Sequence, residues 1–145
     1  MSGTIILKNT TETAIRFSEV DSMAVVWHGN YVKYIEDGRE AFGKQYGIGY
    51  LDVYSHGIMT PVVELNLNYK NYLNYGDDVI IETEFVDTPA AKILFNYKIF
   101  RKSDGLLVLT ARSVQVFTDK DGGLLLTNPP FYTAWKEQMG LIEKE

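Results

Sequence analysis

The alternation of apolar and polar side chains between residues 59 and 118 limits most strongly how this chain can fold. A period of two is typical of β-strands that bury one face, and strands are indicated for residues 63–70, 79–85, 93–102 and 106–118. The Asp-Gly pair at residues 104–105 separates the last two segments and is a strong tight-turn signal. The pattern predicts long strands, the last two of them paired as an antiparallel hairpin.

One segment, residues 30–46, has the period of a substantial helix. Its apolar side chains recur at helical spacing along one face, namely Tyr31, Tyr34, Ile35, Phe42 and Tyr46. Asn30 is expected to be the N-cap, and Gly47 and Gly49 are expected to end the helix. Gly38 and Gly43 lower the helical propensity inside the segment, but they allow close packing against a neighbouring backbone.

The order of these segments predicts a single α+β domain over residues 1–145. Residues 4–17 are rich in β-branched side chains and are expected to form a first strand, and a further helix is expected near the C-terminus. A long antiparallel sheet that buries one face on a single central helix must curve around that helix. Because little chain remains to cover the edges and the outer face of the sheet, we expect at least a homodimer.

The amino-acid composition is that of a soluble globular protein and argues against a nucleic-acid or membrane partner. Hydrophobic residues make up 46% of the chain, charged residues 23%, and the net charge is −5, whereas nucleic-acid-binding proteins usually carry a basic face. The N-terminus lacks the layout of a signal peptide, and no apolar run approaches the roughly 18 residues of a membrane span. The absence of cysteine excludes a thiolate metal site and a cysteine nucleophile, and it fits a cytoplasmic protein.

The stretch EVDSMAVVWHGNY, residues 19–31, contains the main candidates for chemistry. Asp21 lies before the helix start, where a carboxylate is either a turn or capping residue or a nucleophile or general base that apolar neighbours partly desolvate. His28 acts either as an ordinary, partly buried side chain or through its backbone N–H, which near a helix N-terminus can stabilise an oxyanion. No second histidine or cysteine lies nearby to complete a metal site.

Residues 17–36, FSEVDSMAVVWHGNYVKYIE, resemble the signature of the hot-dog fold acyl-CoA thioesterases of the 4-hydroxybenzoyl-CoA thioesterase type. The shared pattern is an acid, an Asp two residues later, a Val-rich step, an aromatic residue, His or Tyr, and Asn-Tyr before a helix. The resemblance extends to residues 60–83 and 105–123. Two positions depart from it: the family often has Gly where this chain has Ala24, and Pro where it has Tyr72.

This resemblance implies a hot-dog fold, in which a long curved antiparallel sheet wraps around a central helix and two protomers join their sheets. It implies that Asp21 is the catalytic carboxylate, as nucleophile or general base, and that the backbone N–H of His28 polarises the thioester carbonyl. A thiolate leaves readily because the pKa of its conjugate acid is about 8.5, so neither a metal ion nor a cofactor is expected. The expected substrate is an acyl-CoA or acyl-carrier protein, and the expected assembly is at least a homodimer, with a homotetramer favoured.

Four further residues are candidates for contacts with the substrate, namely Glu19, Asn30, Tyr31 and Lys70. Glu19 either holds the loop and tunes Asp21 by like-charge repulsion, or is a solvated carboxylate. Lys70 is favoured among the cations that could bind the phosphates of coenzyme A, the others being Arg101, Lys102 and Arg112. His56 is expected to lie in a loop without a catalytic part.

Two other functions are compatible with the same residues. An acyl-thioester dehydratase on this fold would need a histidine base and an acid that face each other across the site. A non-catalytic acyl-thioester binding protein would keep the fold without turnover. The presence of Asp21 in the full pattern favours hydrolysis over both alternatives.

Overall fold

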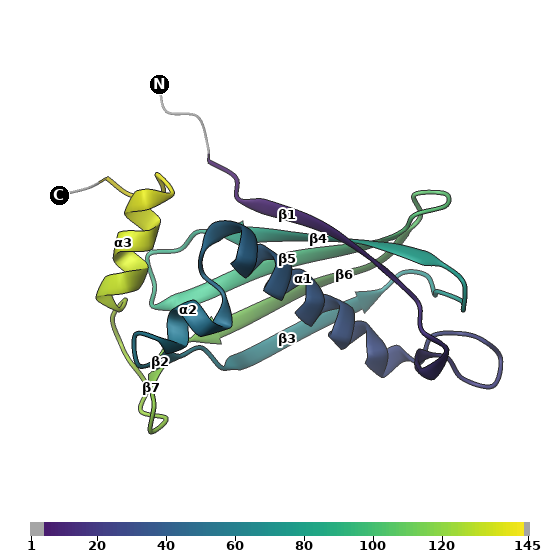
Figure 1. Ribbon diagram of the computed structural model, residues 1–145, viewed down its shortest axis with the longest axis horizontal. Coiled ribbons are helices and arrows are strands. Elements are labelled where there is room, and N and C mark those ends of the chain that lie inside the picture. The colour runs from purple at the N-terminus through teal and green to yellow at the C-terminus, as the bar shows by residue number, and fades with distance from the viewer. Residues whose placement is uncertain (1–4, 144–145) are drawn as a thin grey trace.

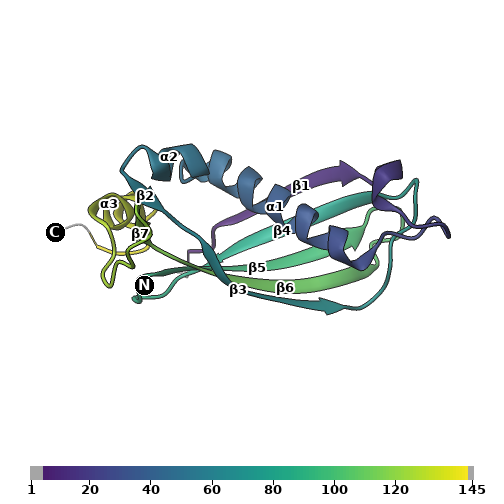
Figure 2. The ribbon, with the colours of Figure 1, turned by 90° about the horizontal axis from the view of Figure 1, so that it is seen from below.

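A five-stranded antiparallel sheet and one long helix make up most of the molecule (Figure 1). The structure, a computed structural model, describes residues 5–143. The strands lie in the order β1-β4-β5-β6-β3, with bounds Lys8–Ala14 for β1, Val62–Tyr69 for β3, Asp78–Val86 for β4, Lys92–Arg101 for β5 and Leu107–Val116 for β6. The helix α1 (Tyr31–Tyr46) lies across one face of this sheet (Figure 2).

Shorter elements connect and extend this framework. Two 3-10 helices, η1 (Phe17–Glu19) and η2 (His28–Asn30), lie between β1 and α1. The remaining elements are α2 (Tyr50–Tyr54), β2 (Ile58–Met59), which pairs with β7 (Thr118–Asp119), and α3 (Pro130–Gln138). All four gather at the end of the molecule opposite the loop that precedes α1 (Figure 1).

The predicted α+β arrangement of a long antiparallel sheet and one central helix is confirmed. The four predicted segments between residues 63 and 118 are strands, and β5 and β6 form the predicted hairpin. Gly105 in the turn of that hairpin has a φ of 71°, which glycine adopts without steric cost. The predicted C-terminal helix is α3. The first strand is shorter than expected, since β1 covers only Lys8–Ala14, and residue 4 of the expected range lies outside the described residues.

Two glycines bring α1 close to its neighbours. A Cβ atom at Gly38 would lie 2.7 Å from Cγ2 of Ile81 in β4, and one at Gly43 would lie 2.7 Å from the Cα atom of Gly49. The close packing that these glycines predict is therefore present. Beneath α1 the inner face of β4 is buried as predicted, through Val79, Ile81, Thr83 and Phe85.

Asn30 occupies the predicted N-cap position directly before α1, but its side chain does not cap the helix. Its backbone is helical (φ −75°, ψ −16°), and its side chain makes no capping bond. The chain enters α1 through the 3-10 turn η2, so the Asn30 N–H already donates to the Trp27 carbonyl (2.9 Å). The side-chain Nδ2 instead donates to the backbone carbonyl of Glu19 (2.8 Å), which ties the preceding loop to the helix start.

The edge strand β3 is exposed on both faces, although its alternation predicts one buried face. α1 packs mainly against β1 and β4, and although the inner face of β6 is buried, the edge strand β3 beyond it is not covered. Val62, Leu65 and Tyr69 on the helix side of β3 are 40%, 36% and 50% exposed. The pattern of β3 was interpreted correctly as a strand, but its apolar face has no cover within residues 5–143 of one protomer.

The C-terminal helix closes the far end of the core. Trp135 is only 6% exposed, and its Nε1 donates to the carbonyl of Tyr46 at the end of α1 (2.8 Å). Lys136 is 3% exposed, and its Nζ reaches Asp87 Oδ1 at 2.7 Å and the carbonyl of Thr88 at 3.0 Å. These contacts fix α3 against both α1 and the connection between β4 and β5. Within residues 5–143, no helix has both the length and the apolar character that crossing a membrane requires.

Candidate active site

The loop between β1 and α1 folds back on itself as a narrow hairpin. The Trp27 N–H donates to the Glu19 carbonyl (3.1 Å), and the Asp21 N–H donates to the Val25 carbonyl (2.8 Å). At the tip the Ala24 N–H returns to the Asp21 carbonyl (3.0 Å). We call residues 21–25 the Asp21 turn. It lies at the exposed end of the molecule from which α1 starts (Figure 1).

Asp21 shapes this turn with one of its two carboxylate oxygens. Oδ1 accepts the backbone N–H groups of Met23 (2.8 Å) and Val25 (3.3 Å), so the turn-residue interpretation from the sequence describes a real contact. Among the described residues no group donates to Oδ2, and the side chain is exposed. The carboxylate is thus held in one orientation with one oxygen open to an incoming group. The expected desolvation is absent from the single protomer, since Met23 is 77% exposed.

Ala24 keeps the turn shape that glycine would favour. Its φ is 61°, in the left-handed region that side chains with a Cβ rarely adopt. Its carbonyl accepts the Tyr75 N–H (2.9 Å) from the loop between β3 and β4. Ala24 therefore adopts a left-handed backbone conformation that glycine would adopt without steric cost.

His28 presents its backbone to the same exposed end. It begins η2, and among the described residues its N–H has no acceptor. Its carbonyl accepts the hydroxyl of Tyr69 at the end of β3 (3.0 Å), while its exposed ring lies against Trp27 with centroids 4.8 Å apart. An unpaired N–H at the start of a helical segment is a suitable donor to a carbonyl oxygen that gains negative charge.

Three of the predicted substrate contacts lie beneath the loop instead of at its surface. Glu19 is 4% exposed, and its Oε1 accepts the Arg16 N–H (2.8 Å) and the Tyr34 hydroxyl (3.1 Å). Asn30 is 9% exposed, and Tyr31 is 2% exposed with its hydroxyl oxygen accepting the Leu73 N–H (3.1 Å). The alternative of a solvated Glu19 is therefore wrong, and all three side chains are used within the chain.

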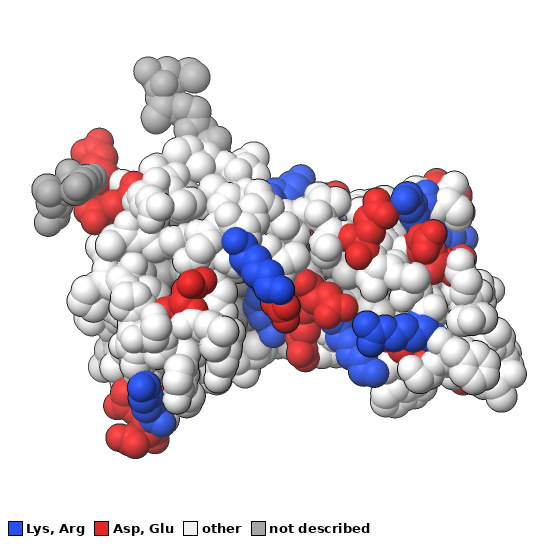
Figure 3. Space-filling view, viewed as in Figure 1, with Lys and Arg blue, Asp and Glu red and all other residues white. Residues whose placement is uncertain are grey.

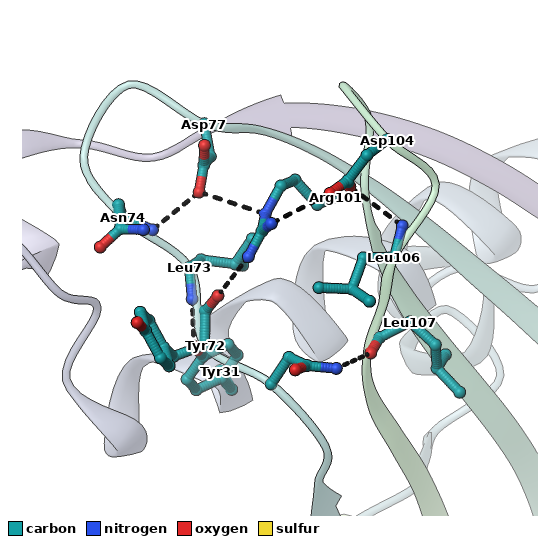
Figure 4. A network of polar contacts seen from close by, with 10 residues as sticks. Tyr31, Tyr72, Leu73, Asn74, Asp77, Arg101, Asp104, Leu106 and Leu107 are labelled. Atoms are coloured by element: carbon teal, nitrogen blue, oxygen red, sulfur yellow. Dashed lines mark hydrogen bonds and ion pairs between the residues drawn. The ribbon is translucent and has the colours of Figure 1, made fainter.

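The four cations considered for coenzyme A phosphates have different surroundings. Lys70 is exposed directly after β3 and makes no ion pair within the described residues, and Arg112 on β6 is also exposed. Lys102 pairs with Glu12 (3.0 Å). Arg101 is taken up by Asp104 (3.1 Å) and Asp77 (3.7 Å) inside a polar network (Figure 4), so it is not a free phosphate ligand.

A cavity of about 500 Å³ opens between α1, α2 and the sheet. Phe42, Phe85 and Phe95 make much of its apolar wall, and Val62 at the start of β3 lies on its rim. The sequence did not reveal this cavity, because its walls come from segments far apart along the chain. It lies at the end of β3 opposite Tyr69, so it is remote from the Asp21 turn of the same protomer.

Charges of both signs surround the cavity along α1. Glu36, Arg39 and Glu40 line it, and acidic and basic side chains are interspersed over the visible face (Figure 3). His56 lies near the same end of the molecule, stacked on Phe131 with ring centroids 4.5 Å apart, and is thus remote from the Asp21 turn. Within residues 5–143 no three His, Asp or Glu side chains are grouped so that they could hold a metal ion.

A sheet wrapped around a long helix, with the candidate carboxylate in the loop that enters the helix, defines a hot-dog fold protein. The DHNA-CoA thioesterase of Staphylococcus aureus has the same architecture, with a TM-score of 0.80, 28% identity and 92% of each chain covered. The 4-hydroxybenzoyl-CoA thioesterase of Pseudomonas sp. strain CBS-3 shares the fold with a TM-score of 0.76 over 88% of this chain and 98% of its own, at 24% identity.

The chain belongs to the thioesterase-like superfamily, whose family model matches residues 15–136. It is also 34% identical, over 110 residues, to the Bacillus subtilis (strain 168) protein named "Putative acyl-CoA thioesterase YneP", a match that covers 76% of this chain and 79% of that protein. The predicted hot-dog fold and the predicted relationship to thioesterases of the 4-hydroxybenzoyl-CoA type are confirmed. The protein is a thioester hydrolase.

Proposed function

We propose that this protein hydrolyses an acyl-CoA thioester to a free acid and coenzyme A, and that Asp21 is its catalytic carboxylate. The observation that carries the proposal is the Asp21 turn itself, where two backbone N–H groups hold Oδ1 and leave Oδ2 open. The name of the Bacillus subtilis relative and the thioesterases of known structure support the substrate class.

The chemistry follows from the groups at the exposed end of α1. The thioester carbonyl oxygen accepts the free N–H of His28, which stabilises the negative charge that develops there. Asp21 either attacks the carbonyl carbon, giving an anhydride that water then cleaves, or removes a proton from the attacking water. In both routes the C–S bond breaks, the thiolate leaves, and water supplies the oxygen of the free acid.

We propose a homodimer in which β3 pairs with β3 of a second copy. The two-fold axis of such an antiparallel pair places Tyr69 of one copy beside Val62 of the other. Tyr69 holds His28, and Val62 lines the cavity, so the Asp21 turn of one protomer faces the cavity of its partner. The acyl group then enters that cavity, and the apolar side of β3 gains the cover that it lacks in one protomer.

The remaining site residues have supporting parts in this arrangement. Glu19, Asn30 and Tyr31 position the loop from below through the bonds described above. Lys70, exposed beside Tyr69, is proposed to meet a phosphate of coenzyme A. The use of acyl-carrier protein, the assembly of dimers into a homotetramer and the cytoplasmic location stay predictions.

Replacing Asp21 with Asn tests the catalytic role, because Asn keeps the size of the side chain and removes its charge. Asp119 is a matched control, since its Oδ1 also accepts the N–H groups two and four residues later, at Asp121 (2.9 Å) and Gly123 (2.8 Å). Thiol release from a panel of short, medium, long and aromatic acyl-CoAs is measured for both variants.

We expect Asp21→Asn to lose at least about a hundredfold in rate and Asp119→Asn to retain the wild-type rate. Equal rates for wild type and Asp21→Asn, with both proteins folded, would exclude Asp21 as the reacting group. No thiol release by wild type from any of the acyl-CoAs would exclude the proposed substrate class.

A further inference from the structure

The loop between β3 and β4 is hydrogen-bonded to the Asp21 turn and to the residue that follows it. The Val26 N–H donates to the Leu73 carbonyl (2.8 Å), and the Tyr75 N–H donates to the Ala24 carbonyl (2.9 Å). Val25 and Asn74 form an isolated antiparallel bridge between these two bonds. We call residues 71–77 the supporting loop. Any displacement of the supporting loop therefore displaces Asp21.

The guanidinium group of Arg101 ties the supporting loop to the turn between β5 and β6 (Figure 4), in addition to the bond from the Leu73 N–H to the Tyr31 hydroxyl oxygen (3.1 Å) and the bond from the Asn71 side chain to the Leu107 carbonyl (2.8 Å). Arg101, at the end of β5, donates through Nη2 to the carbonyl of Tyr72 (3.0 Å), and its Nε lies 3.7 Å from Asp77 Oδ2. The same Asp77 oxygen accepts the Asn74 N–H (2.8 Å). On its other side the guanidinium donates through Nη1 to Asp104 (3.1 Å) in the turn between β5 and β6.

The burial of this network makes it a fixed support. The Arg101 and Asp77 side chains are 21% and 22% exposed, in contrast to the surface pair of Lys102 and Glu12, which are 50% and 53% exposed. Partly buried, charge-assisted contacts of a planar guanidinium have more geometric specificity than surface ion pairs. Arg101 thus links the rigid β5–β6 hairpin to the loop that bears the Asp21 turn.

We infer that Arg101 is a positioning residue for catalysis, which acts on Asp21 through Asp77 and the supporting loop without touching the substrate. The inference rests on the proposed role of Asp21. Sequence analysis placed Arg101 only among the candidates for phosphate binding, because its partners lie far from it along the chain or in another loop: Tyr72 and Asp77 in the supporting loop, and Asp104 in the turn between β5 and β6.

The test replaces Arg101 with Met, which keeps the length of the side chain, and with Lys, which keeps the charge on a single donor group. Lys8→Met is the matched control, since it removes a cross-strand ion pair with Glu82 (3.0 Å) at β1 and β4, away from the supporting loop. If Arg101→Met fails to fold, Asp104→Asn is used as a milder variant, which weakens only the exposed contact between Asp104 and the Arg101 guanidinium.

Two readouts are taken for each variant: the steady-state constants for acyl-CoA hydrolysis, and hydrogen exchange of individual backbone amides. We expect Arg101→Met to lower kcat by roughly tenfold to a hundredfold with little change in KM, because small misplacements of a reacting group are costly. Arg101→Lys is expected to recover part of that loss. In Arg101→Met, hydrogen exchange of the backbone amides of Val26 and Tyr75 is expected to become faster. The backbone amides that are hydrogen-bonded between β5 and β6 are expected to stay protected.

Each outcome separates positioning from general stability. Unchanged kcat in Arg101→Met, or equal losses in Lys8→Met, would overturn the inference, as would exchange that rises throughout the sheet. Full activity of Asp21→Asn would instead refute the proposed catalytic role of Asp21. In that case, faster hydrogen exchange at Val26 and Tyr75 in Arg101→Met would still establish that Arg101 holds the Asp21 turn in place.

Discussion

Asp21 and Asp119 make the same turn with different residues at its strained position. In each turn the Asp Oδ1 accepts the N–H groups two and four residues later, and the residue three positions later has positive φ, 61° at Ala24 and 88° at Gly122. The turn motif alone does not make a carboxylate catalytic. In the proposed mechanism, what distinguishes Asp21 from Asp119 is that it lies in the loop that leads into the free N–H of His28 at the start of η2.

Ala24→Gly is expected to stabilise the protein by about 0.5–1 kcal/mol. Relief of the left-handed strain on a Cβ-bearing residue, about 1–2 kcal/mol, outweighs the extra backbone entropy that glycine loses on folding. Urea unfolding monitored by circular dichroism measures the change. Ala41→Gly in the middle of α1 is the control, and it is expected to destabilise by about 1 kcal/mol; a loss of stability in Ala24→Gly would contradict the prediction.

Tyr34 is expected to make the protein sensitive to alkali. Burial, and then the charge of Glu19, raises the pKa of Tyr34 above its ordinary value of about 10. The folded protein therefore holds this proton more tightly than the unfolded chain, and the stabilisation, complete below about pH 10, is lost as the pH rises further.

The phenylalanine variant isolates this effect. In Tyr34→Phe the free energy of unfolding is expected to fall less steeply above about pH 10 than in wild type, although at neutral pH the variant loses roughly 1 kcal/mol with the hydrogen bond to Glu19. Urea unfolding at a series of pH values gives both quantities. The control is Tyr54→Phe at an exposed tyrosine, and equal slopes in wild type and Tyr34→Phe would refute the expectation.

At the scale of elements, α1 depends on glycines that weaken it as an isolated helix. Gly43→Ala would raise helical propensity by about 1 kcal/mol, yet its Cβ would meet the backbone of Gly49 at 2.7 Å. Because backbone cannot rotate away as a side chain can, we expect a net loss of about 1–3 kcal/mol in the free energy of unfolding.

Gly47→Ala separates this steric effect from backbone strain. Gly47 has a φ of 72° and no heavy atom within 4 Å of an added Cβ, so its substitution is expected to cost only the left-handed strain, about 1–2 kcal/mol. Thermal and urea unfolding measure both variants. A Gly43→Ala protein that is more stable than wild type would mean that α1 and Gly49 can move apart freely.

Secondary-structure elements could be predicted where the local sequence pattern determines them. Features that depend on contacts between segments far apart along the chain were missed. The period of the apolar residues gave α1 and four strands, and Gly38 and Gly43 indicated close packing. Asn30 was predicted to cap α1 because its residue type favours the N-cap position. In the structure its side-chain amide instead donates to the backbone carbonyl of Glu19. The role of Arg101 depends on three loops that only the folded sheet brings together.

At the scale of the whole molecule, the long sheet with one helix correctly indicated uncovered surface, which β3 displays. The cavity could not be foreseen, because α1, α2 and the strands that enclose it meet only after folding. The cavity and the Asp21 turn of one protomer are far apart, so under the proposed homodimer we expect activity to depend on two copies of the chain.

Mixed dimers are expected to show this dependence directly. Met59→Trp is designed to fill the cavity, whose wall includes Met59, and Asp21→Asn removes the proposed catalytic carboxylate. Each variant alone is expected to be inactive. Dimers re-formed from equal amounts of both are expected to recover about a quarter of wild-type activity, since half are mixed and each mixed dimer has one intact site. Acyl-CoA hydrolysis after joint refolding measures the recovery, with size-exclusion chromatography as the check on assembly.

Absence of recovery, with dimers formed, would place the turn and the cavity of each site in one protomer. A mixture of Asp21→Asn and Asp119→Asn serves as control. Both variants keep intact cavities, so mixing them creates no site that either homodimer lacks. The activity of this mixture is expected to follow only the fraction of chains that keep Asp21.

The two tryptophans of the chain lie at opposite ends of the molecule in opposite surroundings. Trp135 lies on the buried face of α3, whereas Trp27 is 54% exposed beside His28. Their fluorescence is therefore expected to report separate events in the unlabelled protein. Emission from Trp135 is expected to shift when the core opens to water, and emission from Trp27 to respond when a thioester reaches the proposed site. With Trp135→Phe, substrate arrival can be followed by stopped flow, apart from the folding of the chain that binds it.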